Sequence, residues 1–181
     1  IGFSAFSGTA IESIVLPKSL KEIGSDAFMD CASLTGVYIS GDANIIVEYG
    51  IFENVNAECT LYVEGYVEQW LNDSTLYKIA TNGVHVKFGS DGQYASVSST
   101  FEVPSSVTEL YLDRLAALGD IAELIIPDTV TEIYGDFYNF NSLTNIDLEA
   151  DDWPQNFYSQ DSLSDNVTVN FAYNTTLVTT N

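Results

Sequence analysis

Histidine is the residue type most often used as a general base near neutral pH, and this sequence contains one, His85. A catalytic triad, a zinc site or general base catalysis would need His85 to meet a nucleophile or further ligands. The repeat pattern described below places only Tyr62 and Glu102 beside it, and they offer a hydrogen bond at most. We therefore expect a satisfied surface histidine, no catalytic residue, no cofactor and no enzyme activity.

Carboxylates and thiols are the other residues that could hold a metal ion. The carboxylates that lie close together in sequence are Asp26 with Asp30, Asp151 with Asp152, and Asp161 with Asp165. None of these pairs has the ligand spacing around a glycine that a calcium loop requires. The two cysteines, Cys31 and Cys59, are too few for a disulfide framework, and no metal-ligand spacing accompanies them. The sequence therefore predicts no specific metal site.

The elements that would position such side chains recur at a fixed spacing. Three apolar positions return 23 residues later: Ile11, Ile14 and Leu16 recur as Leu34, Val37 and Ile39. A period in the low twenties is typical of a solenoid in which each repeat adds a short strand to a stacked core. Similar apolar pairs predict eight strands, at 14–16, 37–39, 61–63, 84–86, 101–103, 124–126, 146–148 and 167–169. In register, they would form one sheet of parallel strands.

Other segments predict what lies between these strands. Segments 106–111 and 129–134 are close copies of each other, and we expect them to form a second row of short strands on the returning side. Val67, Trp70 and Leu71 lie at positions i, i+3 and i+4, which predicts one short helix. The fold class is therefore a β-rich, α+β solenoid: a right-handed stack of short parallel strands with irregular returning segments.

Side chains alternate between the two faces of a strand, so one residue per strand would form a column on the outer, concave face of the sheet. That column reads Val15, Tyr38, Tyr62, His85, Glu102, Ile125, Asp147 and Thr168. Tyrosines beside carboxylates suit recognition of a polar protein surface or a glycan. A simpler interpretation is that tyrosine and threonine favour exposed strands. Within the column, the candidate ligand-binding residues are Tyr38, Tyr62, His85, Glu102, Ile125 and Asp147.

The first third of the chain resembles a known family. The motif consists of Ile23-Gly24, Ala27-Phe28, Cys31, Leu34, Val37 and Ile39, preceded by Leu16-Pro17. It is similar to the BspA-like leucine-rich repeat of bacterial surface proteins, and the lead-in recurs at 103–107 and 126–130. The resemblance implies a leucine-rich-repeat solenoid and an exported, cell-surface module that binds proteins or mediates adhesion without catalysis.

The resemblance also bears on the cysteines and on the domain boundaries. Cys31 occupies a buried position of the motif, which favours a packed free thiol over a Cys31–Cys59 disulfide. In this family a short helix commonly closes an array, yet the repeat spacing favours continuation. We expect leucine-rich repeats with the short helix over 1–81 and degenerate repeats over 82–181, continuous with the first array. The sequence of residues 82–104 is compatible both with one continuous solenoid and with two separate ones.

Composition limits the partners. Five basic against 26 acidic residues give a formal charge of −21, which would repel nucleic acid and anionic membrane surfaces. No apolar run approaches the length of about 18 residues that a membrane span needs. No signal peptide precedes Ile1, and the chain begins within a repeat without a methionine, so we expect a fragment lacking its signal peptide and anchor.

Three functions remain. We favour a non-enzymatic module, extracellular or on the cell surface, that binds a host or bacterial protein through its concave face. The alternative is a carbohydrate or cell-wall binding module, with Tyr38, Tyr62, Tyr111 and Trp153 as stacking platforms for glycan. A purely structural spacer is the third.

Overall fold

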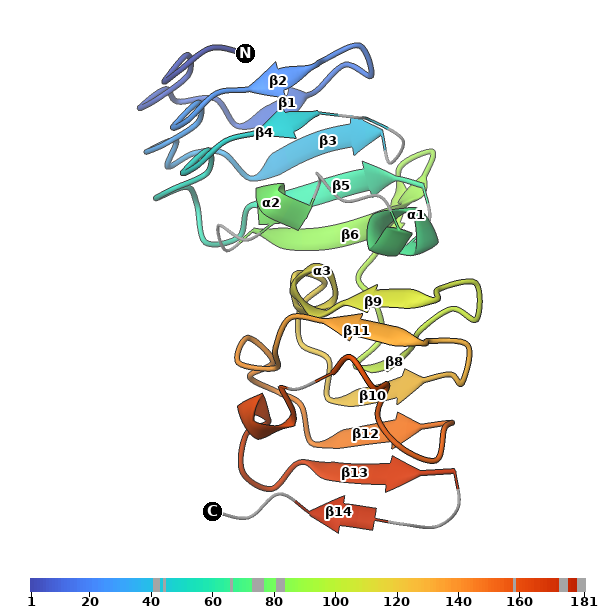
Figure 1. Cartoon of the computed structure of the whole chain (residues 1–181). Helices are drawn as coiled ribbons and strands as arrows, with labels where there is room; N and C mark the ends of the chain where they lie inside the picture. Colours follow the sequence, from blue (N-terminus) through green and yellow to red (C-terminus); the bar gives the residue numbers. More distant parts are fainter. Residues whose placement is uncertain are drawn as a thin grey trace. The chain divides into compact units, whose positions relative to one another are not determined.

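The structure is a computed structural model of the 181-residue chain, and it describes residues 1–40, 43, 45–65, 67–72, 77–80, 84–157, 159–172 and 176–178. The chain divides into two compact units, a first unit of Ile1–Ser96 and a second unit of Val97–Asn181 (Figure 1). Stacks of short parallel strands build both units, which confirms the predicted solenoid fold.

The main sheet of the first unit has five strands in the order β1-β3-β5-β6-β7. Their bounds are β1 Ser13–Val15, β3 Gly36–Ser40, β5 Thr60–Glu64, β6 His85–Ser90 and β7 Gln93–Ala95. The first four are parallel, and β7 runs antiparallel to β6. Ile14 pairs with Val37, and Val37 pairs with Leu61, so the repeat spacing sets the register of the first three strands.

A row of buried side chains explains why these strands stack. Val37, Ile39, Leu61 and Val63 are buried, whereas the residues between them face outward, as period-two alternation requires. On the returning side, β2 (Glu22–Ile23) pairs with β4 (Ile46–Val47). Nearby, the rings of Phe6, Phe28 and Phe52 stack with centroids 5.2 Å apart. The aromatic position of the repeat therefore forms a continuous column inside the unit.

Both cysteines are buried free thiols. The Cys31 thiol donates a hydrogen bond to the Phe6 carbonyl oxygen at 3.0 Å. This contact ties one repeat to the preceding one, and it agrees with the interpretation of Cys31 as a packed free thiol.

Short helices replace the returning strand after β5. Helix α1 (Val67–Asn72) confirms the predicted helix and buries Trp70 and Leu71, and α2 (Tyr77–Ala80) follows it. The Trp70 ring packs edge-on against Phe88 at 5.7 Å. The expectation of one helix was too low, because the described residues also contain α3 (Leu112–Ala116) and the 3-10 turn η1 (Gln160–Ser162).

The main sheet of the second unit has the order β14-β13-β12-β10-β8. The strands are β8 Thr100–Glu102, β10 Glu123–Ile126, β12 Asn145–Leu148, β13 Thr168–Phe171 and β14 Thr176–Val178. On its returning side, β9 (Glu109–Tyr111) pairs in parallel with β11 (Glu132–Tyr134), which confirms the predicted second row of strands.

The structure corrects two details of the expected sheet and adds a strand at its C-terminal end. The eight predicted strands belong to two sheets instead of one. Two strands are shifted by two residues: Leu61 pairs with Val86 instead of Val84, and Ile146 pairs with Val169 instead of Val167. The polar C-terminal segment contributes β14, which runs antiparallel to β13. The predicted continuity of the two arrays stays a prediction.

Candidate ligand-binding groove

Two tyrosines from neighbouring repeats lie together on the outward face of the main sheet of the first unit. Tyr38 and Tyr62 are register partners on β3 and β5. Their rings stack with centroids 4.6 Å apart and planes inclined by 11°. The position beside them on β3 is Gly36, where an added Cβ would lie 3.2 Å from the Tyr38 ring and 3.5 Å from the Tyr62 ring. The absence of a side chain at Gly36 therefore leaves room for the stacked rings.

A third tyrosine reaches this pair from a hairpin outside the repeat. Strands β6 and β7 are joined by Asp91-Gly92, whose φ values of 50° and 79° fit the two-residue turn that favours Asp-Gly. The hairpin places the Tyr94 ring in T-shaped contact with both rings, with centroid distances of 5.2 Å to Tyr62 and 6.4 Å to Tyr38. We call Tyr38, Tyr62 and Tyr94 the tyrosine cluster.

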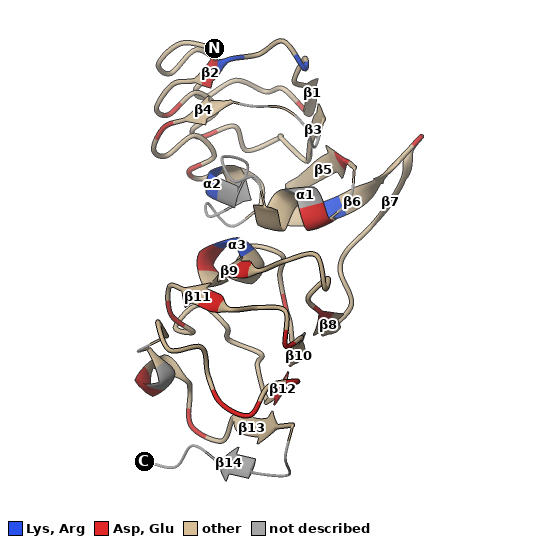
Figure 2. Ribbon diagram, turned by 45° about the vertical axis from the view of Figure 1, so that its right-hand side comes forward, with Lys and Arg blue, Asp and Glu red and all other residues tan. Residues whose placement is uncertain are grey.

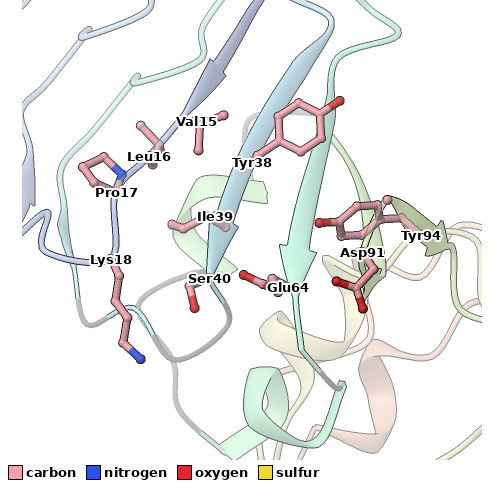
Figure 3. A pocket seen from close by; sticks show the side chains of 11 residues that line it. Val15, Leu16, Pro17, Lys18, Tyr38, Ile39, Ser40, Glu64, Asp91 and Tyr94 are labelled. Atoms are coloured by element: carbon pink, nitrogen blue, oxygen red, sulfur yellow. The ribbon is translucent and has the colours of Figure 1, made fainter.

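The tyrosine cluster borders a groove of about 490 Å³, within the range of roughly 300–1,000 Å³ seen for ligand sites. Figure 3 shows strand β3 along it, Tyr94 and Asp91 of the hairpin at one end, and Lys18 at the other. The lining combines the ends of three parallel strands with the hairpin turn: Val15, Leu16, Pro17, Lys18, Tyr38, Ile39, Ser40, Glu64, Asp91, Gly92 and Tyr94.

Two carboxylates, Glu64 and Asp91, line the hairpin end of the groove. Desolvation by the surrounding residues raises the pKa of the Tyr94 hydroxyl, and the charges of Glu64 and Asp91 raise this pKa further. Both carboxylates therefore lie close enough to the Tyr94 ring to act on it. Glu64 and Asp91 are themselves exposed, so they are available to a ligand in the groove.

The predicted column therefore changes at its fourth member. The structure brings Tyr38 and Tyr62 together as expected, but the register partner of Tyr62 is Lys87. His85 instead pairs with Thr60, which lies on the same face of β5 two residues before Tyr62. The His85 side chain is exposed. His85 is thus displaced from the column because β6 is shifted by two residues.

The sequence analysis missed Tyr94 and Asp91 altogether. Residues 91–92 are an Asp-Gly pair, which is the strongest short signal for a hairpin. An Asp-Gly turn after the strand that contains Phe88 predicts that the chain folds back as a second strand. On that basis the sequence could have placed Tyr94 on a strand beside β6.

The remaining candidates lie in the second unit. Glu102, Ile125 and Asp147 are register partners, and Asn170 completes their column in place of the expected Thr168. The Asn170 amide donates hydrogen bonds to Asp147 at 2.7 Å and to Asn145 at 3.1 Å. Asp147 thus takes part in a polar ladder that ties the strands together. Figure 2 shows acidic residues along this sheet, on β8, β10 and β12.

The other aromatic residues considered for glycan stacking have different surroundings. Trp153 is half-buried: it packs against Phe157 at 5.0 Å and Phe137 at 6.1 Å, and its ring nitrogen is buried. Tyr111 stacks on Tyr134 at 4.8 Å, and the Arg114 guanidinium lies 4.0 Å from the Tyr111 ring centroid. One tyrosine pair of this protein therefore already holds a cation.

Two further properties bear on chemistry. Within the described ranges, no three His, Cys, Asp or Glu side chains are grouped closely enough to hold a metal ion. No helix among the described residues has the length and apolar character to cross a membrane.

Comparison with known proteins identifies the family. The family model for the BspA type leucine rich repeat region matches six copies, over residues 1–82 and 86–176. No curated protein matches the chain. Among solved structures, a leucine rich cell surface protein from Faecalibacterium prausnitzii A2-165 is 14% identical, with 81% of this chain and 70% of that chain covered and a TM-score of 0.23. Because the repeat model covers nearly all of the sequence, the chain belongs to the BspA-type leucine-rich repeat family.

Proposed function

We propose that this chain is a non-enzymatic module of the cell surface that binds another protein through the concave face of its first unit. The BspA-type family is one of surface proteins, and a surface repeat module is consistent with it. The observation that carries the proposal is the tyrosine cluster beside the groove, because tyrosine is enriched in protein interfaces and supplies contact area at low entropic cost.

The geometry of the cluster favours a protein over a glycan. A glycan typically stacks on a broad, open aromatic surface, whereas Tyr38 and Tyr62 stack on each other, which leaves each ring only its outer face. The Tyr94 ring makes T-shaped contacts with the same pair. The rings instead form a compact, half-buried surface beside apolar and charged groups, which resembles the mixed chemistry of a protein interface.

The test is binding of the chain to arrays of extracellular proteins and of glycans, at low and at physiological salt. A Tyr38→Ala/Tyr62→Ala variant removes the stacked pair. A Tyr49→Ala/Tyr138→Ala variant is the matched control, because these tyrosines are 90% and 73% exposed and lie outside the groove. Circular dichroism of each variant establishes that it is folded.

The expected result is a protein partner whose affinity falls about tenfold or more in the groove variant and is unchanged in the control. Glycan binding that depends on Tyr38 and Tyr62 would support the carbohydrate or cell-wall module instead. Absence of binding on both arrays would contradict the proposal and favour a structural spacer.

A further inference from the structure

We propose that the hairpin end of the groove binds a lysine or arginine side chain from a basic segment of the partner protein. This inference rests on the proposed function, because it specifies the partner of the same groove. Its basis is the combination of two exposed carboxylates, Glu64 and Asp91, with the rings of Tyr38 and Tyr94 in the lining of one groove.

Aromatic rings and carboxylates attract a cation in complementary ways. A cation within about 6 Å of a tyrosine ring is attracted by the ring quadrupole, while the alkyl stem of lysine or arginine packs on apolar surface. In this groove Val15 and Ile39 supply apolar surface, and the carboxylates lie beside Tyr94. The groove therefore has places for both the stem and the charged end of a basic side chain.

The second unit contains the same combination with its cation in place. Tyr111 and Tyr134 stack as Tyr38 and Tyr62 do, at 4.8 Å against 4.6 Å. The Tyr111 hydroxyl donates to Glu109 at 3.1 Å, and the Arg114 guanidinium lies 4.0 Å from the Tyr111 ring centroid. A stacked tyrosine pair with neighbouring carboxylates thus accommodates a guanidinium in this protein. In the first unit, we assign that role to a side chain of the partner.

Charge complementarity points to the same occupant. The chain carries a formal charge of −21, so a basic segment would be attracted at long range as well as at contact. Lys18 lines the groove at the end remote from Tyr94 (Figure 3). The incoming cation is therefore expected at the hairpin end, between Glu64 and Asp91, with the neighbouring part of the partner toward β1.

The experiment is an NMR titration of the whole chain with short glycine-serine peptides that carry one central lysine, arginine or norleucine. The ring signals of Tyr38, Tyr62 and Tyr94 report binding at the groove. A Glu64→Gln/Asp91→Asn variant removes both charges and keeps side-chain size, and asparagine suits the positive φ of residue 91. A Glu22→Gln/Glu53→Gln variant makes the same change in net charge at exposed positions outside the groove.

Lysine and arginine peptides are expected to shift the three tyrosines saturably, with the norleucine peptide at least about tenfold weaker. The groove variant should lose this binding, and the matched charge variant should keep it. Equal binding of norleucine and lysine, equal loss in both variants, or no shift of the rings would each overturn the inference.

A separate measurement distinguishes this inference from the proposed function. A protein partner from the array is tested against the same two charge variants. A partner that depends on Tyr38 and Tyr62 but binds equally to the Glu64→Gln/Asp91→Asn variant upholds the proposed function and overturns the inference. If the arrays yield no protein, the proposed function fails, and the peptide titration alone decides whether the groove accepts a cationic side chain.

Discussion

Gly89 lies directly opposite Tyr94 in the β6–β7 hairpin, and a side chain at residue 89 would occupy the position of the Gln93 carbonyl. The Tyr94 Cα would lie only 3.0 Å from a Cβ at residue 89. The close approach of the two hairpin strands therefore depends on glycine. Because the hairpin carries both Tyr94 and Asp91, one wall of the groove depends on this position.

We predict that Gly89→Ala displaces the hairpin and separates Tyr94 from Tyr38 and Tyr62. Nuclear Overhauser contacts between the rings should weaken, and array binding should fall, with little change in the stack of β1, β3 and β5. Gly119→Ala is the control, because residue 119 lies outside the groove, has a positive φ of 115° and has no atom within 4 Å of an added Cβ. Ring contacts preserved in Gly89→Ala would contradict the assigned role of the hairpin.

A second close approach occurs on the returning side of the first unit. Gly50 has a φ of 64°, and an added Cβ would lie 2.5 Å from a carboxylate oxygen of Asp26. Gly8 has a similar φ of 67° with no atom nearby. Gly8→Ala should therefore lower the free energy of unfolding by about 1–2 kcal/mol, the cost of a left-handed backbone. Gly50→Ala should lower it by more.

Chemical denaturation measures both changes. The steric part of the Gly50→Ala effect should shrink when Asp26 is replaced by glycine, which tolerates the φ of 58° at that position. Comparing Gly50→Ala in the wild-type and Asp26→Gly backgrounds isolates the carboxylate contact. Equal effects in the two backgrounds would show that backbone strain alone is responsible.

Strands β6 and β13 show most clearly why the sequence predicts some of these features and not others. Three alternating apolar residues begin one position before each strand: Val84, Val86 and Phe88 for β6, and Val167, Val169 and Phe171 for β13. A shift of two residues keeps the same face buried, so alternation cannot choose between the two registers. The repeat spacing predicted that the first two apolar residues of each set align with the preceding repeat. In the structure the second and third align with it instead.

The groove was harder to predict than the solenoid for a related reason. Tyr38 and Tyr62 occupy equivalent repeat positions, so the period alone places them side by side. Tyr94 belongs to no repeat position and reaches the pair through an antiparallel strand that the period does not contain. Internal repetition therefore predicts the stacked core and its columns, while a hairpin that departs from the repeat completes the candidate site.

Burial controls the reactivity of Cys59. The thiol is fully buried, and desolvation raises its pKa from an ordinary 9.0 to about 11. The thiolate is the reactive form, so alkylation by iodoacetamide at pH 8 should be much slower in the folded chain than in urea. Mass spectrometry of the peptide that contains Cys59 gives both rates. Equal rates in the two conditions would contradict the buried environment.

The same pKa predicts how stability changes with pH. In the unfolded chain the Cys59 thiol ionises near 9, whereas in the folded chain it stays protonated until about pH 11. Its contribution to stability is therefore complete below pH 9 and is lost as the pH rises through 11. Relative to Cys59→Ala, the free energy of unfolding of the wild type should fall between these pH values. A constant difference between the two proteins would argue against the shifted pKa.

The hydroxyl of Tyr134 donates a hydrogen bond to the Glu132 carboxylate, and this bond raises the pKa of Tyr134 to about 12 from an ordinary 10.0. Desolvation and the Glu132 charge act in the same direction. In Glu132→Gln the charge is removed, so the pKa of Tyr134 should return toward 10. Titration of the tyrosine ring carbons by NMR should then show Tyr134 ionising at a lower pH in the variant than in the wild type. Glu149→Gln, which changes an exposed carboxylate in the same unit, is the control.

An unchanged Tyr134 titration in Glu132→Gln would mean that the carboxylates do not hold the stacked pair of Tyr111 and Tyr134. That result would weaken the analogy between this pair and the tyrosines of the groove.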